Sequence, residues 1–110
     1  MTHTLTSHGK LQVLALEGEI DMHSSPAVRQ LILELVKKKV PVAIDLSAVK
    51  YMDSSGVATL VEGLQNAKKM GQGFVILSPV GSVLGVIKLA RLDKVFRIAA
   101  SIAECGDLVG

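Results

Sequence analysis

Short apolar runs rich in β-branched residues alternate with apolar residues at helical spacing along most of this chain, and this alternation restricts the fold more than any other feature. Strands that alternate with helices are joined by right-handed crossovers, which place the strands parallel in one sheet. The expected strands cover residues 11–16, 40–46, 74–77 and 95–98, and the expected helices begin near residues 25, 54 and 80, with a final helical turn or two at 100–104. The sequence therefore predicts an α/β fold with a mostly parallel central sheet flanked by helices.

The first twenty residues are expected to add an antiparallel edge to this sheet. The turn signal His8-Gly9-Lys10 precedes the strand at 11–16, so a short hairpin partner should lie before the turn. A chain of 110 residues is long enough for one hydrophobic core and too short for two, and no linker or internal repeat divides it. We therefore expect residues 1–110 to form a single domain.

Composition and charge argue against several kinds of partner and site. The formal net charge is only +2, and one Tyr, two Phe and no Trp offer few stacking platforms, so nucleic acid is not an expected partner. The histidines His3, His8 and His23 have no ligand-like spacing, and Cys105 is the only cysteine. We expect no metal site, no cofactor and no disulfide within the chain.

The N-terminal residues and the longest uncharged stretch both bear on localisation. Residues 1–8 lack the basic and apolar regions of a secretory signal. The uncharged stretch 70–87 has nearly the length of a membrane span, but Pro79 and four glycines interrupt it. Because a lone cysteine also fits a reducing compartment, we expect a cytoplasmic protein without direct membrane insertion.

The segment 45–56 is expected to be the loop that displays functional residues. Ligands and partners of parallel sheets meet the loops that follow the carboxyl ends of the strands. Asp53 or Ser54 can cap the second helix, and Gly56 would keep the backbone N–H groups of its first turn accessible. Phosphorylation of an exposed seryl hydroxyl here would add about −1.5 to −2 charges, which a helix N-terminus tolerates and Asp53 repels.

Three segments of the chain, in order and at matching spacing, carry a family resemblance. They are Gly18-Glu19-Ile20-Asp21, the stretch from Asp45-Leu46-Ser47 through Tyr51-Met52-Asp53-Ser54-Ser55-Gly56, and Leu89-Ala90-Arg91-Leu92-Asp93-Lys94-Val95-Phe96. Together they resemble the signature of bacterial anti-sigma-factor antagonists, which are STAS domains. One departure concerns the partner rather than the fold, because the family commonly continues Gly-Leu-Gly where this chain has Gly56-Val57-Ala58.

The resemblance implies a phosphorylation switch. Such an antagonist binds a serine-kinase anti-sigma factor while it is unphosphorylated, which frees the sigma factor. The kinase then phosphorylates the antagonist and releases it, and a phosphatase acts on the phosphorylated form. By position, Ser54 is the phosphoacceptor and Asp21 matches a residue that contacts the kinase. Asp53, Ser55 and Gly56 complete the presented loop.

Several other interpretations compete with this one. No Ser-His-Asp arrangement or carboxylate pair points to catalysis, so no catalytic residue is assigned and an enzyme is not expected. A receiver domain would have an acidic pair after its first strand, which Leu16-Glu17-Gly18-Glu19 matches poorly. Asp53 and Ser54 could be an ordinary capped helix start, and Asp21 could merely lead into the first helix. A related STAS domain could also serve as a constitutive subunit, for example beneath a membrane transporter, with no phosphorylation.

Overall fold

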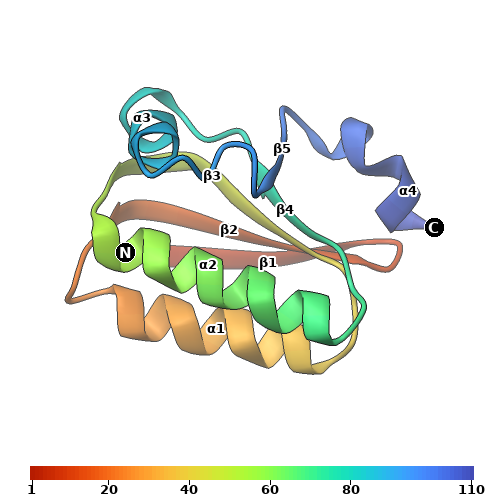
Figure 1. Cartoon of the computed structure of the whole chain (residues 1–110). Coiled ribbons are helices and arrows are strands. Elements are labelled where there is room, and N and C mark those ends of the chain that lie inside the picture. Colours follow the sequence, from red (N-terminus) through yellow and green to blue (C-terminus); the bar gives the residue numbers. More distant parts are fainter.

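A five-stranded sheet with the strand order β1-β2-β3-β4-β5 forms the centre of the computed structural model, which describes residues 1–110 (Figure 1). The first two strands pair antiparallel, and every other neighbouring pair is parallel. The strands are β1 (Thr2–His8), β2 (Leu11–Ile20), β3 (Val42–Met52), β4 (Phe74–Leu77) and β5 (Arg97–Ala99). The helices are α1 (Ser25–Lys37), α2 (Ser54–Lys69), α3 (Gly81–Leu89), the 3-10 turn η1 (Ile102–Cys105) and α4 (Gly106–Val109). The predicted α/β class and the antiparallel N-terminal edge are confirmed.

Helices α1 and α2 run side by side across one face of the sheet (Figure 1). Their apolar residues at helical spacing point inward, as the sequence pattern predicts, and Ile32 of α1 and Leu60 of α2 are fully buried. They pack in one cluster with Leu14, Ile44 and Ile76 from the three central strands. The packing of α1 and α2 on the sheet therefore fixes the position of the first turn of α2 relative to the ends of the strands.

The C-terminal residues cover part of the other face. The sequence predicts a final helical turn or two at 100–104, and in the structure the helical residues start at Ile102 and extend through η1 and α4 to Val109. Val109 accepts a hydrogen bond from the Lys10 backbone N–H at 2.8 Å, and Arg97 forms an ion pair with Asp107 at 2.7 Å. Cys105 lies beneath this segment with none of its surface exposed.

Two strands differ from the sequence prediction. β3 does not end at residue 46, because its second half continues to pair with β2 as far as Met52, although β4 reaches only Asp45. The last strand begins at Arg97 rather than residue 95, since the backbone N–H groups of Val95 and Phe96 donate to the Leu92 carbonyl in a turn. Residues 45–52 therefore belong to β3. Of the loop expected at 45–56, only Asp53 lies between this strand and α2.

Helix α3 takes the place of β4 beside the second half of β3. The Ser82 hydroxyl at the start of α3 donates to the Lys50 carbonyl at 3.1 Å. The uncharged stretch 70–87 is thus divided among a turn, β4 and α3. None of the helices combines the length and the hydrophobicity that crossing a bilayer requires.

Candidate functional site

The end of β3 and the start of α2 are separated by a single residue, Asp53. Met52 pairs with Ile20 at the end of β2, and the Asp53 backbone N–H donates to the Ile20 carbonyl at 3.1 Å. The loop between β2 and α1, which contains Asp21, therefore lies beside the first turn of α2. The structure brings these predicted site residues together at the carboxyl ends of two parallel strands, where partners of such sheets commonly bind.

Asp53 caps α2. Its carboxylate oxygen Oδ1 accepts from the Ser55 backbone N–H at 2.9 Å and from the Ser55 hydroxyl at 2.5 Å. The Ser55 hydroxyl is the main cause that lowers the pKa of Asp53, and the backbone N–H groups of Ser55, Gly56 and Met22 lower it further against the opposing effect of burial. The side chain is therefore an anion anchored to the first turn of α2.

The two serines at the start of α2 have different surroundings. Ser55 is half-buried and its hydroxyl is bound to Asp53. Ser54 is the first residue of the helix, it is exposed, and its hydroxyl has no hydrogen-bond partner within the chain. Sequence reasoning alone offered either Asp53 or Ser54 as the cap, and the structure assigns that role to Asp53. The Ser54 hydroxyl therefore takes no part in capping the helix.

Gly56 is buried, and its Cα faces the sheet rather than the solvent. A Cβ at this position would lie 2.5 Å from Met52 Cγ and 2.9 Å from Ile20 Cγ2. The lack of a side chain at Gly56 is therefore required by packing against the sheet, a reason that the sequence prediction did not include. Its absent side chain lets the helix start pack directly on the paired ends of β2 and β3.

Asp21 organises the entry to α1. Its Oδ1 accepts from the backbone N–H groups of His23 at 2.9 Å and Ser24 at 3.1 Å, and the Ser24 hydroxyl donates to the Glu19 carbonyl at 3.0 Å. The hydrogen bond from the Ser24 N–H is the main cause that lowers the pKa of Asp21. Helix α1 begins at Ser25, as the sequence predicts, and its N-cap residue is Ser24.

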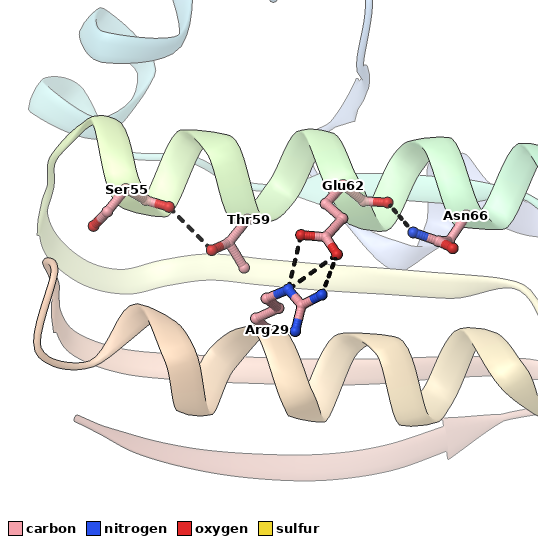
Figure 2. Close-up of polar contacts among 5 residues, drawn as sticks. All are labelled: Arg29, Ser55, Thr59, Glu62 and Asn66. Atoms are coloured by element: carbon pink, nitrogen blue, oxygen red, sulfur yellow. Dashed lines mark hydrogen bonds and ion pairs between the residues drawn. The ribbon is translucent and has the colours of Figure 1, made fainter.

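Helix α2 is fixed to α1 by an ion pair behind the site. Figure 2 shows Arg29 of α1 reaching Glu62 of α2, with Arg29 Nε 2.8 Å from Oε1 and Nη2 2.7 Å from Oε2. On the same helix, the Thr59 hydroxyl donates to the Ser55 carbonyl at 3.0 Å (Figure 2). The ion pair links the exposed sides of α1 and α2, whereas the Thr59 hydrogen bond lies within the first turns of α2.

Sequence reasoning missed two exposed apolar side chains at the site. Met22 follows Asp21 and is 70% exposed, and Tyr51 precedes the end of β3 and is 48% exposed. A hollow of about 400 Å³ at the loop between β2 and α1 is lined by Met1, Glu19, Asp21, His23 and Ser24. Apolar periodicity identifies core residues, so it cannot signal single apolar residues that face solvent.

The family model described as the STAS domain matches residues 4–105. The chain belongs to the STAS domain family. This confirms the resemblance seen in the three sequence segments.

STAS relatives of this chain include named antagonists. The anti-sigma-F factor antagonist RsfB of Mycobacterium tuberculosis is 31% identical, over 94% of this chain and 85% of that protein. The anti-sigma-B factor antagonist of Bacillus subtilis is 27% identical, over 77% of this chain and 78% of that one. A crystal structure of an anti-sigma factor antagonist from Mycobacterium paratuberculosis has a TM-score of 0.88 and 30% identity, covering 98% of this chain and 92% of that chain.

Proposed function

We propose that this STAS domain is an anti-sigma-factor antagonist whose unphosphorylated form binds a serine-kinase anti-sigma factor and frees the sigma factor. Phosphorylation of Ser54 by that kinase ends the binding, and a phosphatase resets the protein. The observation that carries the proposal is the contrast between the exposed, unbonded hydroxyl of Ser54 and the hydroxyl of Ser55, which is held by Asp53. The names of the relatives support the antagonist role.

The partner surface is proposed to comprise Asp21, Asp53, Ser54, Ser55 and Gly56. Asp53 and Ser55 position Ser54, and Gly56 contributes through the packing of the first turn. Asp21 has one carboxylate oxygen, Oδ1, engaged by backbone N–H groups, so Oδ2 is available to a partner. We assign the protein no catalytic role and place the exchange of partners in the cytoplasm.

A phosphate on Ser54 would act on the partner's contacts rather than on the fold. The α2 N-terminus favours a negative charge, so the phosphorylated helix should remain folded. The added charge of about −1.5 to −2 lies beside the Asp53 carboxylate, which makes this surface strongly anionic. A partner that carries bound nucleotide phosphates would be repelled.

Phosphopeptide mapping with the cognate kinase and ATP tests the proposal. We expect modification of Ser54, none on the Ser54→Ala variant, and loss of kinase binding by the phosphorylated protein. The Ser55→Ala variant is the matched control and should still be modified. Phosphate on Ser55 with Ser54 unmodified would contradict the assignment of Ser54 as the phosphoacceptor. A kinase that neither binds nor modifies the protein would contradict the switch and favour a constitutive subunit.

A further inference from the structure

The outer edge of β1 has no partner strand and none of the usual features that prevent edge pairing. All seven residues of β1 are exposed, and the segment contains no proline, lysine, aspartate or glutamate. Edge strands are normally kept apart by such residues, by bulges or by very short length. The opposite edge of the sheet follows that rule, because β5 is only three residues long. The β1 edge is therefore prepared for pairing rather than protected from it.

A groove runs along this edge between β1 and α1. One hollow of about 100 Å³ is lined by residues that include Leu5, Leu35 and Lys38, and a wider one of about 380 Å³ is lined by residues that include Met1. His3, Leu31 and Glu34 line both hollows, so the two are continuous. Leu5 is 46% exposed and Met1 is 42% exposed at its floor. Helix α1 thus leaves apolar surface of β1 uncovered.

We propose that a second copy of this chain occupies the edge, with the two β1 strands paired antiparallel about a two-fold axis at Leu5. The two five-stranded sheets would then form one continuous sheet. Such pairing places Leu5 opposite the partner's Leu5 and Thr4 opposite the partner's Thr6, and threonine and aliphatic cross-strand pairs are favourable. The two leucine side chains would lie together over the groove and remove its apolar floor from water.

Charges on α1 make this arrangement self-complementary. The smaller hollow places Leu5 beside both Glu34 and Lys38 of α1, so a two-fold axis at Leu5 passes close to the turn between them. The two α1 helices would run antiparallel, and Glu34 of each copy would face Lys38 of the other. Because α1 packs on β2 through Leu14, the helices would lie about three strand spacings apart, on the order of 14 Å, which these long side chains can bridge.

A strand from an unrelated protein could use the same backbone edge, but it would gain nothing from the paired arrangement of Glu34 and Lys38. Self-association also leaves Ser54 exposed, because neither β1 nor the groove contains a residue of α2. The inference is therefore independent of the proposed kinase switch, and either can fail while the other stands.

Charge reversal combined with mixing tests the dimer. Sedimentation of the wild-type protein should give a mass twice the chain mass of 11.6 kDa as concentration rises. Glu34→Lys and Lys38→Glu should each weaken dimerisation at least about tenfold, since each places like charges in opposition twice. An equimolar mixture of the two variants should recover dimers, because every facing pair is again opposite in charge. Gln65→Lys, an exposed change on α2, is the matched control and should dimerise like wild type.

Three results would overturn the inference. The first is a wild-type protein that stays at 11.6 kDa at millimolar concentration, which would leave the edge free for a strand from another protein. The second is a dimer that survives both charge reversals and also Leu5→Lys. The third is a mixture of the reversed variants that remains monomeric while circular dichroism shows both to be folded.

Discussion

The backbone N–H of Asp53 donates to the carbonyl of Ile20 at 3.1 Å, which joins the end of β3 to the end of β2. The carboxylate of the same residue caps the helix that carries Ser54, so Asp53 links the paired strand ends to the start of α2. The pairing of the two strand ends therefore places the start of α2, with Ser54, beside the loop that contains Asp21. A partner that contacts both Asp21 and Ser54 would bind a surface that is already formed in the free protein.

Gly56→Ala should destabilise the fold by about 1–3 kcal/mol, because the new methyl group would overlap Met52 and Ile20 at the helix start. Urea unfolding measures the change. Gly85→Ala is the matched control, since a Cβ on this helical glycine meets nothing within 4 Å. It should leave the free energy of unfolding unchanged or raise it by about 0.5–1 kcal/mol. Equal losses in both variants would contradict the close packing of Gly56.

Asp53 should make stability depend on pH in the acid range. Its pKa in the folded protein lies below the ordinary value of 3.8, chiefly through the Ser55 hydroxyl, so its contribution is present above pH 3.8 and is lost as the pH falls through the lower folded pKa. Thermal melts of wild type and Asp53→Asn, which keeps a capping oxygen, should diverge at neutral pH by a few degrees and converge in acid. Parallel profiles at every pH would mean that the carboxylate charge adds nothing.

The fold was largely predictable from sequence because α1, α2 and the buried strands carry uninterrupted apolar periodicity. The second half of β3 was not, since polar residues such as Ser47 and Lys50 break the pattern and the pairing with β2 shifts register twice. The site could be located by family resemblance, but the role of each residue within the site could not be predicted. Which of Asp53 and Ser54 caps the helix, and which way Gly56 faces, depend on contacts with Ile20 that only the folded sheet creates.

Asp21→Asn separates partner binding from structure. The amide oxygen can still accept from the His23 and Ser24 N–H groups, so the turn into α1 should persist and the melting temperature should change by no more than a few degrees. Kinase affinity should fall by about tenfold or more if the carboxylate charge is recognised. Asp21→Ala, which also removes the turn, should lose both affinity and stability. A large drop in melting temperature with unchanged affinity in the Asn variant would restrict Asp21 to the helix lead-in.

The most direct test of the switch is calorimetry of wild type, Ser54→Ala and Ser54→Glu against the nucleotide-bound kinase. Asp53 rather than Ser54 caps α2, so Ser54→Ala should fold normally, cost no more than about 0.5 kcal/mol of stability and bind nearly like wild type. Ser54→Glu sets a fixed negative charge against the kinase's nucleotide phosphates. This variant should lose about 2–3 kcal/mol of binding free energy, which corresponds to a complex weaker by roughly 30- to 150-fold. Equal affinity of all three proteins would contradict the switch.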